Sequence, residues 1–326
     1  MSRTGDAEAV TAAAEPEDPF EAGDPFDAAD VRALQRKSIG VLGSSQVLGG
    51  VAVAGSLPAG ALIAESISGS EAAAGLAQTF GVVGAALLAL PLARVALSRG
   101  RRAALAGGYF LGSLGSIIVI VGAVYRSLAI VYAGCLLVGV ASAAGLQARY
   151  AATDLASANR RARSLSIVVW GATIGAVAGP NLLDVSGRWA QSLGLPPLAG
   201  PYLVAAIACG VTVGLLLVFL RPDPYRESLR LRGDITPGVR RPRIRDGIGH
   251  LKNRPRAVLG IGAVAVGHVA MVMVMVMTPV HMAHVDVSLQ LIGLVISVHV
   301  AGMYALSPLV GMAVDRFGRL TVIGAG

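Results

Sequence analysis

Residues 268–319 read HVAMVMVMVMTPVHMAHVDVSLQLIGLVISVHVAGMYALSPLVGMAVDRFGR. The stretch holds two apolar runs, and each is long enough to cross a bilayer as a helix, because about 20 residues span the hydrocarbon core. It closes on the charged turn Asp315-Arg316-Phe317-Gly318-Arg319. We therefore expect two membrane helices followed by a compact turn at the membrane surface.

The rest of the chain has the same character. Hydrophobic residues make up 54% and charged residues 14%, and the mean hydropathy is +0.68. Soluble domains carry about 25% charged residues, so an ordinary soluble fold is excluded. The sequence predicts an all-α polytopic membrane protein with eight spans and the start of a ninth at Leu320. The eight apolar runs cover residues 39–66, 71–97, 103–125, 128–151, 164–184, 201–220, 257–283 and 287–314.

Charge and proline divide the chain into four parts. Residues 1–35 carry nine acids up to Asp30, which predicts a disordered acidic tail. Residues 36–220 form an expected six-helix half, and residues 257–326 form part of a second half. Between them, the loop 221–256 holds eleven basic residues and five prolines. This arrangement is typical of an internal repeat in a membrane carrier.

The basic residues predict the orientation. Arginines follow the second, fourth, sixth and eighth runs, whereas the opposite loops hold only Arg126 and Arg188. By the positive-inside rule, we expect a cytoplasmic N-terminus in a multi-pass protein of the cell membrane. The net charge of +8 is explained in this way, so we expect no nucleic-acid partner.

Two short turns occupy equivalent places, each after the second span of a half. Both contain Gly-Arg, at Gly100-Arg101 and at Gly318-Arg319. We interpret them as gating elements, with a generic basic loop as the alternative. The predicted gating residues here are Gly100, Arg101, Gly311, Asp315, Arg316, Gly318 and Arg319.

The second turn, Gly311-x-x-x-Asp315-Arg316-x-Gly318-Arg319, resembles the cytoplasmic-loop motif of the major facilitator superfamily. The resemblance implies a secondary transporter with two six-helix halves that works by alternating access. The first turn departs from the motif, since Leu97 stands where the aspartate would be. This departure puts in doubt any charge relay in the first half.

The fifth run contains GATIGAVAGP, residues 171–180. Its glycines lie four apart, so they remove side chains from one helix face and allow close approach of another helix, and Pro180 permits a bend. Gly175, Gly179 and Pro180 are similar to the antiporter motif of the superfamily's exporters, which implies proton-coupled export of small organic molecules. Simple helix packing is the alternative.

Methionines and histidines suggest a different substrate. Met271 and Met275 share a helix face with His268, whereas Met273 and Met277 share the opposite face with His281, and the sequence does not choose between the faces. The pair Met271-x-x-x-Met275 together with His299-x-x-x-Met303 resembles the motifs of copper importers in the same superfamily. Thioether and imidazole groups suit Cu(I). The candidate substrate ligands are Met271, Met275, His299, Met303 and Tyr304. His281 is a candidate ligand of a metal-entry site, with an ordinary interfacial residue as the alternative.

Few polar groups lie inside the spans. Gln46 in the first span needs a partner in lipid, and Arg149, near the end of the fourth span, is expected to extend toward the interface. If transport is coupled to protons, histidine is the expected carrier.

Together these features favour a superfamily-type secondary transporter, with copper import as one version and proton-coupled export of small organic molecules as another. A truncated, non-transporting membrane protein is a further alternative. An enzyme is not expected, because no catalytic cluster or phosphate-binding loop is evident. We expect a monomer without a cofactor, with the lipid bilayer and a small molecule or metal ion as partners.

Overall fold

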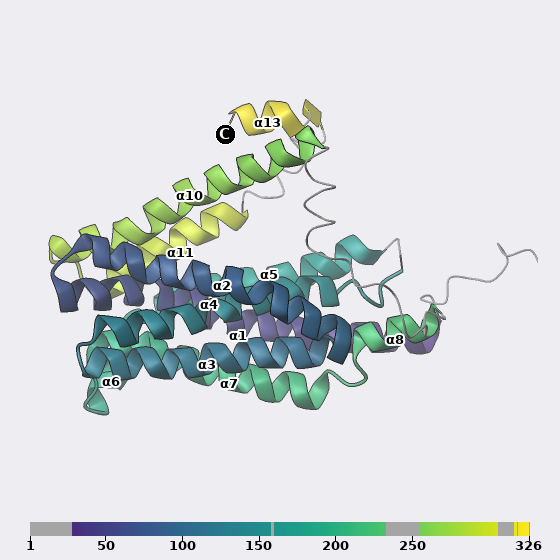
Figure 1. Ribbon diagram of the computed structural model, residues 1–326, viewed down its shortest axis with the longest axis horizontal. Helices are drawn as coiled ribbons and strands as arrows, with labels where there is room; N and C mark the ends of the chain where they lie inside the picture. Colours follow the sequence, from purple (N-terminus) through teal and green to yellow (C-terminus); the bar gives the residue numbers. More distant parts are fainter. Residues whose placement is uncertain (1–27, 158–159, 233–253, 306–315, 318, 326) are drawn as a thin grey trace, which may run out of the picture.

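The computed structural model describes residues 28–157, 160–232, 254–305, 316–317 and 319–325. Within these ranges all regular structure is helical (Figure 1). The elements are α1 (Ala29–Ser68), α2 (Glu71–Arg99), α3 (Arg101–Val124), α4 (Leu128–Ala151), α5 (Arg161–Asn181), α6 (Leu183–Ser192), η3 (Pro197–Ala199), α7 (Gly200–Phe219), α8 (Pro224–Leu231), α10 (Pro255–His284), α11 (Leu289–Ala305) and α13 (Arg319–Ala325).

Six of the described helices are long and apolar enough to cross a membrane, and α5 with α6 makes a seventh, bent span. The predicted eighth span, 287–314, is described only over the 17 residues of α11. The predicted start of a ninth span at Leu320 lies in the short helix α13. The prediction of an all-helical membrane protein is thus confirmed.

The start of α1 differs from the predicted tail at 1–35. The helix begins at Ala29, and Val31 and Gln35 are buried. Gln35 Nε2 donates to the carbonyl of Ala152 at 2.7 Å and to Ser164 Oγ at 3.2 Å. These contacts with the end of α4 and the start of α5 hold a polar segment in a helix that composition alone assigned to the tail. Residues 1–27 lie outside the described part.

The predicted loop 221–256 also contains a helix, the eight-residue α8. Asp223 caps its start, because Asp223 Oδ1 accepts hydrogen bonds from the backbone amides of Tyr225 at 3.1 Å and Arg226 at 3.3 Å. Asp223 Oδ2 also accepts from the amide of Arg102 at 2.8 Å. A single carboxylate therefore ties α8 to the start of α3, which is distant in the sequence.

One end of the bundle collects the basic turns. Here α1 begins, α2 and α4 end, and α7 ends, so that Lys37 Nζ donates to the carbonyl of Arg221 at 3.2 Å. We call this end the basic side and the other end the opposite side. Alternating helices bring every second loop to the same end, as the predicted topology requires.

The helices α10 and α11 join the bundle mainly at the opposite side (Figure 1). Val276 and Val280 of α10 are buried against Leu62 and Ala74, whereas residues 258–270 are exposed. On α11, Ser297 Oγ donates to the carbonyl of Val177, near the end of α5, at 2.8 Å. The helices α10 and α11 thus contact the bundle at the opposite side, and α10 diverges from it toward the basic side.

Candidate functional site

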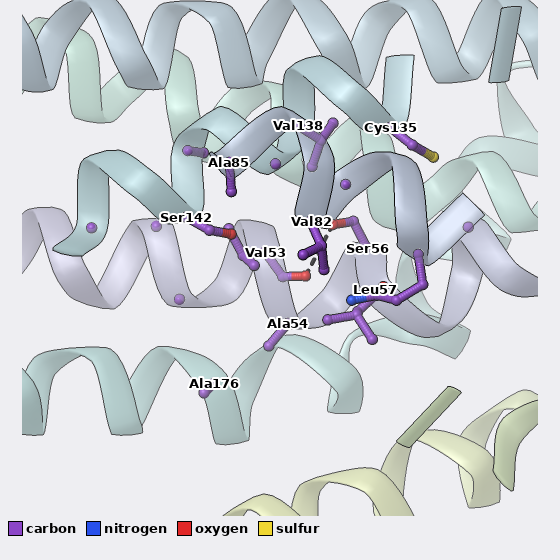
Figure 2. A pocket seen from close by; sticks show the side chains of 18 of the residues that line it. Val53, Ala54, Ser56, Leu57, Val82, Ala85, Cys135, Val138, Ser142 and Ala176 are labelled. Carbon is purple, nitrogen blue, oxygen red and sulfur yellow. Dashed lines mark hydrogen bonds between the residues drawn. The ribbon is translucent and has the colours of Figure 1, made fainter. Parts of the chain in front are cut away.

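A cavity of about 470 Å³ lies between α1, α2, α4, α5 and α10. Its lining is mostly small and apolar, and no acidic residue belongs to it among the described residues. Figure 2 shows the side chains contributed by four of these helices: Val53, Ala54, Ser56 and Leu57 from α1, Val82 and Ala85 from α2, Cys135, Val138 and Ser142 from α4, and Ala176 from α5.

Glycines shape the wall of this cavity. A Cβ atom at Gly49 would come within 2.6 Å of Tyr109 Oη, which is closer than real contacts allow. Gly60 makes room for the hydroxyl of Tyr202 in the same way. Because α1 lacks side chains at these two points, Tyr109 of α3 and Tyr202 of α7 fit against it and form part of the cavity wall.

Gln46 of α1 has the partners that an amide in a membrane span needs. Its Nε2 donates to the carbonyl of Gly145 at 2.9 Å, and its Oε1 accepts from Tyr109 Oη at 3.3 Å. The prediction that Gln46 requires a partner is confirmed. Sequence reasoning did not single out Tyr109, because one tyrosine in a glycine-rich span carries no motif.

Arg149 lies at the basic-side end of the cavity. It lines the cavity, and its Nε atom is shielded from solvent without a hydrogen-bond partner. No hydrogen bond or ion pair joins Arg149 to another residue in the part of the chain that the structure describes. The Nε atom of Arg149 is thus buried at the cavity wall, and the expectation that the side chain extends toward the interface stays a prediction.

The structure distinguishes the two methionine faces of α10. Met271 and Met275 line the cavity together with His268. Met273 is 64% exposed and Met277 is 38% exposed, and neither belongs to the lining. The face that carries Met271 and Met275 is thus the inward one.

The other candidate metal ligands are not brought to this cavity. His299 and Met303 are exposed on α11, and His281 is exposed near the end of α10. Tyr304 lies in α11, but its side chain is outside the described part. Among the described residues, no group of three or more His, Cys, Asp or Glu side chains could hold a metal ion. The copper site stays a prediction.

The glycine face of α5 packs against α1. A Cβ atom at Gly171 would meet the backbone of Gly43, and one at Gly179 would meet the backbone of Gly55. At Gly175 an added Cβ would overlap the carbonyl oxygen of Val47. Beyond Pro180, α5 gives way to α6 at an angle of 56°. The predicted close approach and bend are confirmed, whereas a gating role for Gly175, Gly179 and Pro180 stays a prediction.

Arg101, in the first predicted gating turn, has a partner outside that turn. Its Nε donates to Asp154 Oδ2 at 2.8 Å, its Nη2 to Asp154 Oδ1 at 3.2 Å, and its Nη1 to Gln147 Oε1 at 3.1 Å. The guanidinium group also lies 5.3 Å from the ring centre of Tyr225. Gly100 adopts φ of +96°, a conformation that favours glycine and makes the turn possible.

Asp154 supplies a carboxylate that the first turn lacks at Leu97. Burial raises the pKa of Asp154 above its ordinary value, although the hydrogen bonds and charge of Arg101 oppose this shift. Sequence reasoning missed Asp154, yet it is the first acidic residue after Glu71, at the end of a span. An isolated acid at a basic membrane surface is the pattern that would have indicated it.

The second turn is described only in part. Gly311, Asp315 and Gly318 lie outside the described residues. The guanidinium group of Arg316 stacks on the ring of Phe317, with 5.6 Å to its centre, and Arg319 begins α13.

Comparisons with known proteins agree with this architecture. The chain is 39% identical to the uncharacterized MFS-type transporter YddS of Bacillus subtilis over 89% of its own length and 66% of that relative. It is 38% identical to YdeG of the same organism over 88% of its own length and 67% of that protein. It is 28% identical to the riboflavin transporter RfnT of Brucella anthropi over 89% and 70% of the two chains.

The chain thus spans about two thirds of the length of these curated relatives, and none of the three names mentions copper. The family model described as Major Facilitator Superfamily matches residues 42–326. By this match and by its bundle of membrane helices, the chain belongs to the major facilitator superfamily.

Proposed function

We propose that this protein acts in secondary transport of a small organic solute, which binds in the cavity between α1, α2, α4, α5 and α10. The observation that carries the proposal is the cavity itself, with a volume of about 470 Å³ and a mostly apolar lining. Sites for small molecules are typically about 300–1,000 Å³, with a few placed polar groups. Gln46, Ser142 and Arg149 are polar groups of this kind.

The arrangement of the helices supports alternating access. The helices α1, α2 and α10 pack together at the opposite side, where His284 Nε2 lies 2.6 Å from Glu65 Oε1. Toward the basic side α10 is exposed. Such a shape corresponds to a state open at the basic side, and a second state would open the opposite side by rocking α10 and α11 against the bundle.

The test is accumulation of a panel of solutes in cells with and without the gene. Riboflavin belongs in the panel because one relative is named a riboflavin transporter. We expect at least one organic solute to accumulate differently, in either direction, and a cavity-blocking Gly145→Trp variant to abolish the difference. No difference for any solute, with the protein shown to reach the membrane, would contradict the proposal.

Copper import is a second candidate, supported by the cavity position of Met271, Met275 and His268. The test is the copper content of cells that express the wild type or Met275→Leu combined with His299→Ala. Copper import predicts a lower content in the variant at equal expression, and an unchanged content counts against it.

Proton coupling belongs to the export version of the proposal. His268 is the histidine that lines the cavity. Efflux that loses its dependence on a pH gradient in His268→Gln, while binding persists, would support coupling through this residue.

A further inference from the structure

We propose that Arg149 binds the anionic group of the substrate, so that the cavity takes an amphipathic monoanion: an apolar body that carries one carboxylate, sulfonate or similar group. The inference rests on the proposed solute-binding function and names its substrate class. It is carried by the position and the unsatisfied hydrogen-bonding capacity of Arg149.

The electrostatics of the lining favour an anion. Arg149 gives the cavity a permanent positive charge, and no aspartate or glutamate belongs to the lining among the described residues. A guanidinium group that is partly removed from water is costly unless an anion or acceptor pairs with it. The charge of Arg149 is therefore available to a ligand, whereas Arg101 forms an ion pair with Asp154.

Hydrogen bonding leads to the same conclusion. The Nε atom of Arg149 is shielded from solvent and has no partner within the described ranges. Buried donors are nearly always paired in folded proteins, so an unpaired one at a cavity wall indicates a missing acceptor. The forked donors of arginine match the two oxygens of a carboxylate.

The remaining lining defines the body of the ligand. Ser142 and Cys135 lie on the same helix as Arg149, seven and fourteen residues before it. At 1.5 Å per residue the cavity extends about 20 Å along α4 from Arg149 toward the opposite side. Between these points the wall consists of residues such as Val53, Val82 and Val138. The ligand is thus expected to be elongated, with its charge at the basic side.

The test uses the purified full chain in detergent and three naphthalene probes of one shape: naphthalene-2-carboxylate, naphthalene-2-carboxamide and 2-(aminomethyl)naphthalene. Binding is measured by the shift in thermal unfolding and by protection of Cys135 from alkylation. We expect the carboxylate to bind best and Arg149→Gln to weaken its binding about tenfold, with little effect on the carboxamide. Arg149→Lys should retain part of the preference for the anion.

Arg126→Gln is the matched control. Arg126 Nη2 donates to the carbonyl of Ser66 at the opposite side, outside the cavity, at 2.9 Å. This variant removes one positive charge from the protein and should leave all three affinities unchanged. Equal weakening by both variants would overturn the proposal, because it would show a general effect of charge.

The outcomes distinguish a failure of the anion inference from a failure of the solute-binding function. If carboxylate and carboxamide bind equally and Arg149→Gln changes neither, the cavity binds organic solutes but Arg149 does not select anions. If none of the probes binds to the wild type, both the anion inference and the solute-binding function lose their support. If Arg149→Gln fails to fold, the probe series on the wild type and Arg149→Lys decides, and equal binding of the three probes overturns the inference.

Discussion

The helices α5 and α10 are both apolar and both contain several glycines, yet they pack in different ways. On α5, Gly171, Gly175 and Gly179 lie against the backbone of α1. On α10, a Cβ atom added at Gly260 or Gly262 would meet no neighbouring helix within 4 Å among the described residues. Lipid tails are as apolar as the side chains, so hydrophobicity does not drive two membrane helices together. The difference teaches that a glycine stripe packs where the partner helix carries matching glycines.

The partner of α5 supplies those glycines. Gly43, Gly50 and Gly55 of α1 lie where the glycines of α5 approach. The helix α10 instead attaches through larger side chains at one end, where Val276 and Val280 are buried. We therefore call the glycine contact between α1 and α5 the frame, because we expect it to stay closed. We call the contact of α10 at Val276 and Val280 the joint, because we expect it to open.

The largest expected effect comes from breaking the frame. A Gly175→Leu variant places side-chain atoms where Val47 and Gly50 of α1 now lie, and we expect it to destabilise the fold by about 3 kcal/mol or more. The measurement is the yield of monodisperse protein by size-exclusion chromatography. The matched control, Gly262→Leu on α10, should behave like the wild type. Equal losses in the two variants would show that the comparison between α5 and α10 is wrong.

A medium effect is expected at the basic side of the bundle, where the start of α3 meets the residues that follow α4. Asp154→Ala removes the charged partner of the largely buried Arg101, which keeps only its hydrogen bond to Gln147, and should lower the stability by about 2 kcal/mol. Asp154→Asn keeps an acceptor oxygen and should cost less, because burial raises the pKa of Asp154 and the folded state thus disfavours its charged form.

Thermal unfolding at neutral pH measures both Asp154 variants. Because the pKa of Asp154 is higher in the folded state, the folded state takes up its proton first as the pH falls. The wild type should therefore gain stability relative to Asp154→Asn as the pH falls through this raised pKa. The control Asp184→Ala breaks an exposed pair with Arg188 and should change stability by less than about 1 kcal/mol. An Asp184→Ala loss as large as that of Asp154→Ala would refute the assignment.

The smallest effect is expected at the joint. Glu65→Gln weakens the contact with His284 that connects α1 and α10. A single partly exposed contact of this kind contributes less than about 1 kcal/mol, so we expect the fold to persist while the opposite side opens about two- to threefold more often. The measurement is labelling of a cysteine introduced at Leu57 by an impermeant maleimide from the opposite side. A labelling rate identical to that of the same cysteine in the wild type would contradict a joint at this position.

Much of the fold could be predicted, because a membrane imposes it locally. The length of each apolar run sets where a helix crosses. The glycines of α5 predicted its close approach to another helix, and Pro180 predicted its bend. The tail boundary could not be predicted in this way. Gln35 belongs to α1 through its contacts with Ala152 and Ser164, which are more than a hundred residues away.

The candidate site was less predictable than the fold. The residues Met271 and Met275 were named from spacing, but their spacing was equally compatible with the face of Met273 and Met277. Which face turns inward depends on the rotation of α10 against α1 and α2. Arg149 had an ordinary explanation in sequence, and its inward position depends on the packing of α4.

The sequence by itself determined that this chain crosses a membrane repeatedly, that its basic turns gather on one side, and that α5 presents a glycine face. These properties follow from composition and spacing within single segments. The tertiary structure alone decided that Asp154 pairs with Arg101, that α10 turns Met271 and Met275 toward the cavity, and that Arg149 faces it without a partner. The physical reason is that an interaction between distant segments depends on how helices rotate and cross, which apolar runs of similar composition leave open.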